Sequence, residues 1–275
     1  MLPNFLIIGS AKAGSTSLYA YLRSHPDVFM PATKELDFFV SERNWKLGVD
    51  WYERQFNAAD DARGIGEASV RYTMYPWYEG VPRRIATVLP SARLVYVVRH
   101  PIERMVSHYQ HRVRANHEHE RLEDALLDKP LYLNTSRYAF QIEQYLEFFQ
   151  ADQILVVVTE QLRANRSATL NAVLNFLEVE PEVAEESIAA EYNVTSGKWA
   201  PRRATRTLMR LPGWNRFASS IPDTVKVVGR RVSHQQLRSI VLSKPAVDEL
   251  EGRLREDVGR LRQFVSGEFD GWGIA

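Results

Sequence analysis

Three short apolar runs occur along the chain, and each has the length and composition of a buried β-strand. The runs are FLIIG at 5–9, LVYVVR at 94–99 and ILVVV at 154–158, each short enough for one strand and rich in branched residues. Strands that are apolar on both faces are typical of a parallel sheet that is covered by helices on either side. We therefore expect these three segments to form the centre of a buried parallel sheet.

Segments with apolar residues at three-to-four spacing lie between and after these runs, as expected for helices that bury one face. The expected helices cover 16–24, a segment that begins at Pro101, 136–149, 167–177 and 247–264. The first helix should end near His25, because a residue before a proline is disfavoured in the helical conformation. This alternation predicts an α/β fold, namely a single P-loop-like domain at 1–275 with a central, mostly parallel sheet and helices on both faces.

Composition narrows the possible classes of function. The 275 residues are 45% hydrophobic, which is enough for a full core. The net charge of +1 predicts no global attraction to nucleic acid or to a membrane, so any anion specificity must be local. The chain has no cysteine, which excludes disulfides, thiol nucleophiles and Cys-ligated metals. With no signal-like segment at its N-terminus, we expect a cytoplasmic protein without membrane insertion.

The strongest chemical signal follows the first apolar run. Four residues separate Gly9 from Gly14, and Ser15 and Thr16 follow, which almost satisfies the phosphate-loop pattern G-x4-G-K-[ST]. The lysine, however, comes two residues before the second glycine, at Lys12. Free N–H groups at the start of a helix attract an anion. The stretch therefore predicts a phosphate site built from Lys12, Ala13, Gly14, Ser15, Thr16 and Ser17.

Two observations argue against a metal at this phosphate site. The run 94–99 ends in Arg99, where a nucleotide triphosphatase carries an aspartate for Mg²⁺. Histidines do cluster nearby, but they lie on a charged helix end without the support that a catalytic zinc site needs. These histidines are His108, His111, His117 and His119. We expect a phosphate ligand that is bound without metal.

Several motifs together resemble the sulfotransferases that use 3′-phosphoadenosine 5′-phosphosulfate (PAPS). SAKAGSTSL at 10–18 resembles their 5′-phosphosulfate loop, and VVRHPIERMVSHYQH at 97–111 resembles their 3′-phosphate motif. KELDFF at 34–39, GEASVRY at 66–72 and the segment at 136–149 resemble motifs of the branch that sulfates carbohydrates. Two positions depart from those motifs: Asp37 stands for the usual histidine and Ala68 for the usual lysine.

The resemblance implies a role for each matching residue. Lys12 would neutralise charge on the leaving 5′-phosphate, and Arg99 with Ser107 would bind the 3′-phosphate of PAPS and of its product, adenosine 3′,5′-bisphosphate (PAP). Glu35 is the implied general base, with Glu67 as the reserve candidate.

The family commonly adds a second cation for the 3′-phosphate from a late basic loop. Residues 198–231 hold nine basic side chains and one acidic side chain. Lys198 and Arg202 are the candidates from this stretch. A solvated basic surface is the alternative interpretation.

The expected activity is sulfuryl transfer from PAPS to a hydroxyl of a carbohydrate, glycolipid or small-molecule acceptor by in-line displacement. Two alternatives stay open: a nucleotide-dependent phosphotransferase with a variant P-loop, and a non-catalytic nucleotide- or glycan-binding protein of the same fold. The aromatic residues at 45–56 and 72–78 are candidates for either an acceptor cleft or the core. No nucleic acid partner is expected.

Overall fold

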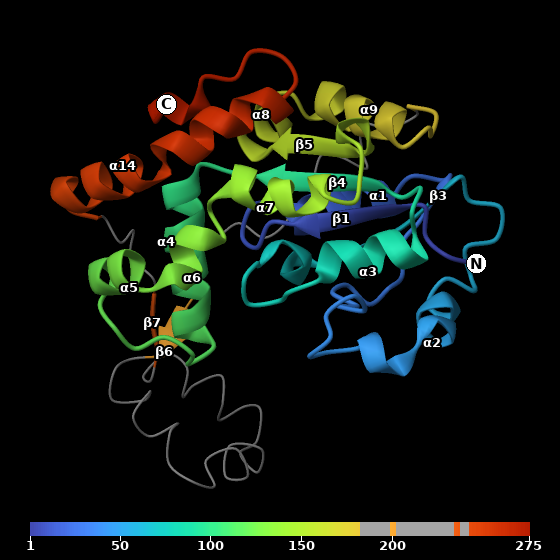
Figure 1. Ribbon diagram of the computed structural model, residues 1–275, viewed down its shortest axis with the longest axis horizontal. Coiled ribbons are helices and arrows are strands. Elements are labelled where there is room, and N and C mark those ends of the chain that lie inside the picture. Colours follow the sequence, from blue (N-terminus) through green and yellow to red (C-terminus); the bar gives the residue numbers. More distant parts are fainter. Residues whose placement is uncertain (182–198, 202–233, 237–241) are drawn as a thin grey trace, which may run out of the picture.

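The computed structural model of the protein describes residues 1–181, 199–201, 234–236 and 242–275 (Figure 1). Its centre is a parallel sheet with strand order β2-β3-β1-β4-β5. The strands are β1 (Phe5–Gly9), β2 (Val28–Phe29), β3 (Gly64–Ala68), β4 (Arg93–Val98) and β5 (Ile154–Val158). The three strands expected from the apolar runs are confirmed, and they lie side by side as β1, β4 and β5.

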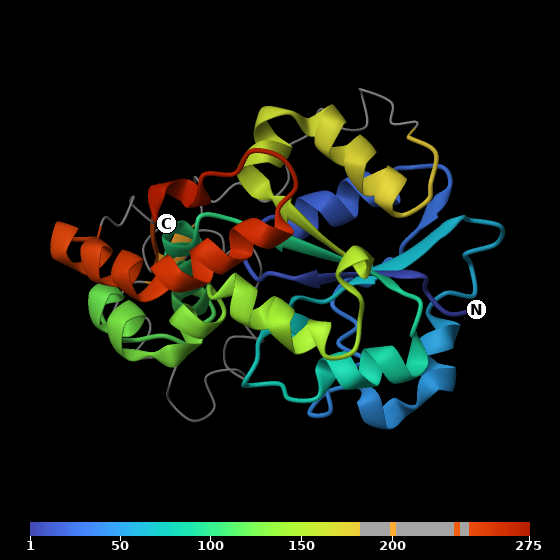
Figure 2. The same cartoon turned by 45° about the horizontal axis from the view of Figure 1, so that its top comes forward.

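Helices cover both faces of the sheet (Figure 2). Side chains of α1 and α9 pack with Phe5, Ile7 and Val95 on one face, and side chains of α3 and α7 pack with Leu6 and Ile8 on the other. The bounds of these helices are α1 (Ser15–Arg23), α3 (Val81–Val88), α7 (Tyr138–Leu146) and α9 (Arg166–Phe176). The α/β fold with helices on both faces is thereby confirmed.

A third hydrophobic cluster lies beside the sheet and is built around α4 (Pro101–Arg114). It includes α5 (Leu122–Asp128), α6 (Pro130–Asn134) and the C-terminal helix α14 (Lys244–Leu261). Asp257 of α14 accepts hydrogen bonds from the first N–H groups of α7, at Ala139 (3.1 Å) and Phe140 (2.9 Å). The carboxylate thus caps α7 and ties the C-terminal helix to the sheet layer.

The remaining described elements are shorter. They are the helices α2 (Val49–Arg54) and α8 (Thr159–Ala164), the 3₁₀ turns Trp45–Leu47, Val70–Thr73, Ala151–Gln153, Arg262–Phe264 and Gly271–Gly273, and the antiparallel pair β6 (Trp199–Pro201) and β7 (His234–Gln236). The candidates Lys198 and Arg202 lie outside the described residues.

Strand β3 was not expected, because its sequence GIGEA does not have the composition of a buried strand. Its glycine at Gly66 has a packing reason: a Cβ added there would lie 2.3 Å from the ring of Phe5 on β1. The strand therefore fits beside β1 only without a side chain at this position.

Candidate active site

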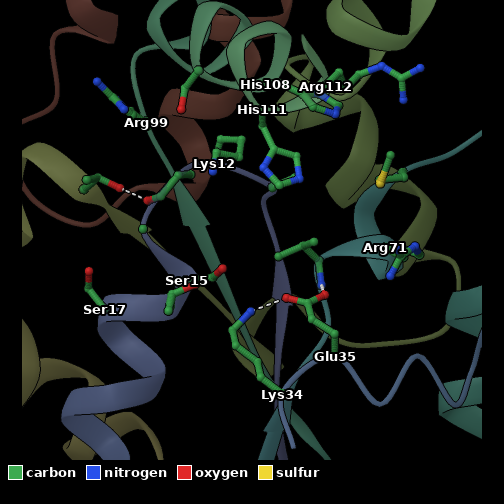
Figure 3. A pocket seen from close by; sticks show the side chains of 18 of the residues that line it. Lys12, Ser15, Ser17, Lys34, Glu35, Arg71, Arg99, His108, His111 and Arg112 are labelled. Atoms are coloured by element: carbon green, nitrogen blue, oxygen red, sulfur yellow. Dashed lines mark hydrogen bonds and ion pairs between the residues drawn. The ribbon is translucent and has the colours of Figure 1, made fainter. Parts of the chain in front are cut away.

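A cavity of about 910 Å³ opens at the carboxyl ends of the parallel strands (Figure 3). Its walls come from the loop after β1, the segments after β2 and β3, the helix α4 after β4, and α8 after β5. Ligands of open α/β sheets commonly bind at this edge. The cavity brings together all the described residues that the sequence predicts for the site: Lys12, Ala13, Gly14, Ser15, Thr16, Ser17, Glu35, Arg99 and Ser107.

The loop between β1 and α1 has the backbone of a phosphate cradle. Lys12 and Gly14 both adopt left-handed conformations, with φ of 72° and 98°, and α1 begins directly afterwards at Ser15. The first N–H groups of a helix have no partner within it and carry its positive dipole end. The hydroxyl of Thr159 on α8 contacts the carbonyl oxygen of Ala13, which fixes the loop against the end of β5.

The glycine that ends β1 is required by packing. A Cβ added to Gly9 would lie 1.9 Å from the hydroxyl oxygen of Thr73. That hydroxyl donates to the carbonyl oxygen of Ile8 at 3.1 Å, so the 3₁₀ turn after β3 rests directly on the end of β1. The first glycine of the motif thus allows this close approach.

Arg104 of α4 supports the β1–α1 loop, although no sequence motif pointed to this residue. The side chain is fully buried and donates to Ser136 Oγ (2.6 Å), the carbonyl oxygen of Tyr132 (2.8 Å) and that of Ala11 in the loop (3.3 Å). No carboxylate among the described residues forms an ion pair with it. Its charge is therefore compensated by carbonyl and hydroxyl oxygens, close to the predicted phosphate site.

His108 lies next to Arg104, with its Nδ1 at 3.3 Å from the guanidinium. Burial and the adjacent positive charge of Arg104 hold the pKa of His108 well below its ordinary value of 6.5. The imidazole is therefore neutral, and its Nδ1 accepts from Arg104.

Arg99 follows the last residue of β4, and its turn is fixed by neighbouring helices. Tyr138 of α7 donates to the carbonyl oxygen of Arg99 at 2.7 Å, and the N–H of His100 donates to Glu160 of α8 at 3.1 Å. The Arg99 guanidinium pairs with Glu103 one helical turn later. Ser107 lines the same cavity from α4, where it is 7% exposed.

Glu35 lies on the cavity wall, and its carboxylate is held at both oxygens. One oxygen pairs with Lys34, and the other accepts the N–H of Val70 at 2.9 Å (Figure 3). The Glu35 side chain is 29% exposed, so a bound molecule can reach the carboxylate. A surface glutamate could also pair with a neighbouring lysine. Here, however, both Lys34 and Glu35 line the cavity.

Glu67, the reserve candidate for the base, has a different environment. Its side chain is fully buried and accepts from Ser69 Oγ (2.7 Å), Tyr72 (2.5 Å) and Tyr52 (3.3 Å). Burial raises the pKa of Glu67 to about 7, although the Tyr72 and Ser69 hydroxyls oppose the shift. Glu67 does not line the cavity. The geometry therefore favours Glu35 as the carboxylate that meets a ligand.

The two motif departures fall beside Glu35. Asp37 is 5% exposed and pairs with Arg71, whose side chain reaches the cavity. Burial raises the pKa of Asp37 against the opposing effect of Arg71. The acid that replaces the family's histidine thus holds an arginine on the cavity wall. The unusual acid at position 37 indicated a change in this part of the site. The sequence alone did not show that Arg71 would be the residue in contact with Asp37.

Charge is concentrated in this cavity. Among the described residues, its lining holds nine lysine and arginine side chains and a single acidic one, Glu35, although the whole chain carries a net charge of only +1. The basic residues are Lys12, Lys34, Arg43, Arg71, Arg99, Arg112, Arg114, Arg163 and Arg166. The expected local anion specificity therefore has a structural basis.

Within the part of the chain that the structure describes, no group of three or more His, Asp or Glu side chains is arranged to hold a metal ion. No helix in that part is long and apolar enough to cross a bilayer.

Comparison with known proteins decides the family. Residues 2–206 match the family model of the sulfotransferase domain. The chain belongs to this family. The sulfotransferase resemblance stated from the motifs is thereby confirmed, and the match includes the β1–α1 loop, the segments at 34–39 and 66–72, and α4.

Among curated sulfotransferases, this chain is similar to human bifunctional heparan sulfate N-deacetylase/N-sulfotransferase 2. The two are 31% identical over 202 residues, which cover 66% of this chain and 22% of the human protein. It is also 28% identical over 213 residues to mouse heparan sulfate glucosamine 3-O-sulfotransferase 5, covering 73% of this chain and 60% of that enzyme. The chain thus spans about a fifth of the length of the first of these relatives.

Solved sulfotransferase structures agree with the fold. A sulfotransferase from Alicyclobacillus acidocaldarius superposes with a TM-score of 0.70 at 25% identity, covering 99% of both chains. A mouse sulfotransferase solved in complex with PAP superposes with a TM-score of 0.50 at 12% identity, covering 99% of this chain and 87% of that one. The second likeness shows the fold alone.

Proposed function

We propose that the protein transfers a sulfuryl group from PAPS to a hydroxyl group of a carbohydrate. One observation carries this proposal: Lys12, Glu35, Arg99 and Ser107 come from three separate segments of the sequence and line one cavity. Membership of the sulfotransferase family and the heparan sulfate specificity in the names of its relatives support both the reaction and the acceptor class.

The β1–α1 loop binds the 5′-phosphosulfate in this proposal. The backbone N–H groups at the start of α1 and the hydroxyls of Ser15, Thr16 and Ser17 donate to its oxygens. Arg99 forms a charge-assisted contact with the 3′-phosphate, and Ser107 adds a hydroxyl donor. This pair distinguishes PAPS from nucleotides without a 3′-phosphate.

The oxygen of the acceptor hydroxyl attacks sulfur, and Glu35 accepts the proton of this hydroxyl. The bond between sulfur and the bridging oxygen breaks at the same time, and the electron pair leaves with the 5′-phosphate of PAP. Lys12 neutralises the charge that develops on this leaving oxygen. The nine basic side chains of the cavity lining favour the same build-up of negative charge. Positioning and electrostatics thus supply catalysis.

Turnover in the presence of PAPS and a desulfated heparan polysaccharide tests this proposal. We expect PAP and sulfated saccharide in equal amounts, with PAP formation dependent on the saccharide. ATP turnover with Mg²⁺ and no PAPS turnover would favour the phosphotransferase alternative. PAP binding without turnover of any acceptor would favour the non-catalytic alternative.

A further inference from the structure

A second cavity of about 240 Å³ lies between the start of α3 and helix α7. It shares one wall residue, Tyr78, with the large cavity. Its other lining residues are Tyr72, Tyr75, Gly80, Pro82, Arg83, Gln141, Gln144, Tyr145, Glu147 and Phe148. The two cavities therefore adjoin at Tyr78.

Hydrogen bonds fix the wall of this second cavity. Gln141 accepts the N–H of Tyr75 at 3.0 Å and donates to the carbonyl oxygen of the same residue at 2.8 Å. The hydroxyl of Tyr145 donates to the carbonyl oxygen of Tyr72 at 2.8 Å. The cavity is thus formed before a ligand arrives, which lowers the entropic cost of binding.

One of the aromatic rings that line the cavity is exposed to solvent. Phe148 is 42% exposed, whereas the rings of Tyr72 and Tyr145 are buried in the wall. An exposed aromatic side chain at a concave site lined by further aromatic rings is typical of a ligand-binding pocket. Flat rings suit the apolar face of a sugar ring.

The polar side chains of the lining differ from those of the large cavity. Among the described lining residues, one arginine, Arg83, is balanced by one glutamate, Glu147, and Gln144 adds a side-chain amide. These residues offer hydrogen-bond donors and acceptors without a net charge. Together with the aromatic rings, they fit a neutral, hydroxyl-rich ring better than an anion.

The position of Arg71 connects the two cavities. Arg71 and Tyr78 both line the large cavity, and Arg71 lies near Glu35 in Figure 3. A saccharide whose reacting hydroxyl lies at Glu35 can therefore extend past Arg71 and Tyr78 into the second cavity.

We propose that the second cavity is an acceptor subsite for a neutral sugar ring, separate from the ring that receives the sulfuryl group. The inference rests on the proposed carbohydrate acceptor and deepens it: the acceptor is an oligosaccharide or a polysaccharide. A free monosaccharide would fill only one of the two cavities.

The test uses unsulfated heparan-backbone di-, tetra- and hexasaccharides, in which neutral N-acetylglucosamine alternates with glucuronate. Each is titrated by calorimetry into the PAP-loaded protein, for the wild type and the variants Phe148→Ala and Gln144→Ala. Leu47→Ala is the matched control, because Leu47 is 45% exposed and lines neither cavity.

We expect the wild type to bind the tetrasaccharide more tightly than the disaccharide. Phe148→Ala should weaken tetrasaccharide binding by about three- to tenfold and leave disaccharide and PAP binding unchanged. Gln144→Ala should act in the same direction, and Leu47→Ala should have no effect.

If affinity does not rise with saccharide length in the wild type, or if both cavity variants keep the full rise, the subsite is refuted while the proposed function stands. If no saccharide binds although PAP does, the subsite is refuted together with the carbohydrate part of the proposed function.

Discussion

Glu35 and Glu67 lie on adjoining segments but in opposite environments. The Glu35 carboxylate is partly exposed on the cavity wall, held by Lys34 and the N–H of Val70. The Glu67 carboxyl is fully buried among the hydroxyls of Tyr52, Ser69 and Tyr72. The same residue type thus has two different roles: Glu35 can meet a substrate, whereas Glu67 packs inside the protein.

Replacing Glu35 tests its role as general base. We expect Glu35→Gln to lower kcat by about 100-fold or more, because general base catalysis contributes about 10²- to 10⁴-fold. PAP affinity, measured by calorimetry, should stay within about twofold. Glu42→Gln, at an exposed glutamate that does not line the cavity, is the control. A near-normal kcat for Glu35→Gln would show that another group takes the proton.

The buried carboxyl of Glu67 should make the free energy of unfolding depend on pH. Its pKa rises from 4.5 to about 7 in the folded protein, so the folded state binds the proton more tightly than the unfolded state. This contribution to stability is fully present below about pH 4.5 and is lost as pH rises through 7. We expect Glu67→Gln to show a smaller fall in the free energy of unfolding between pH 4.5 and 7, measured with urea. An identical pH dependence in both proteins would contradict the assignment.

Substitutions of Arg99 and of its partner Glu103 should have different effects on cofactor binding. Arg99→Ala should weaken PAP binding by about 10- to 100-fold, because a charge-assisted contact to the 3′-phosphate is lost. ADP binding should change little, since ADP has no 3′-phosphate. Glu103→Gln removes the carboxylate that pairs with Arg99 and should leave PAP binding equal or tighter. Equal losses of PAP and ADP affinity in Arg99→Ala would argue against a 3′-phosphate contact.

At the scale of elements, the phosphate loop depends on segments far away in the sequence. Arg104 of α4 joins Ala11 in the loop to Tyr132 at α6 and to Ser136 before α7. Thr159 of α8 holds Ala13 from the other side. The conformation of the loop is therefore set by α4, α6 and α8 as well as by its own glycines.

Arg104→Lys tests this support. A lysine keeps the charge but lacks the planar guanidinium that reaches three partners at once. We expect a loss of about 2–4 kcal/mol in the free energy of unfolding, because buried acceptors lose their donors. Urea unfolding measures the loss, and Arg255→Lys, on the exposed face of α14, is the control. Equal stability of Arg104→Lys and the wild type would show that the contacts do not support the fold.

Some elements of the fold could be predicted from the sequence, and others depend on contacts that only the folded chain makes. The strands β1, β4 and β5 were predictable because both of their faces are apolar, and the motif residues at their carboxyl ends followed. Strand β3 was missed because Gly66 is required by the ring of Phe5, a contact that only the folded sheet shows. Arg104 was missed because it lies on a helix rich in charged residues, and it is buried against Tyr132 of α6, Ser136 and the loop residue Ala11.

For the whole molecule, the distribution of charge matters more than its sum. The chain has nearly equal numbers of basic and acidic residues, yet nine basic side chains and one glutamate line the large cavity in the part of the chain that the structure describes. Such a site attracts a highly charged nucleotide without making the whole surface basic. The adjoining neutral cavity at Tyr78 adds a region of different chemistry for the acceptor.

The central claim is that this cavity binds a 3′-phosphorylated nucleotide without metal. Calorimetric titration of PAP and of ADP, each with and without Mg²⁺, tests it most directly. We predict a clear preference for PAP that Mg²⁺ does not change. Preference for ADP in the presence of Mg²⁺ would contradict the account and favour a phosphotransferase with a variant P-loop.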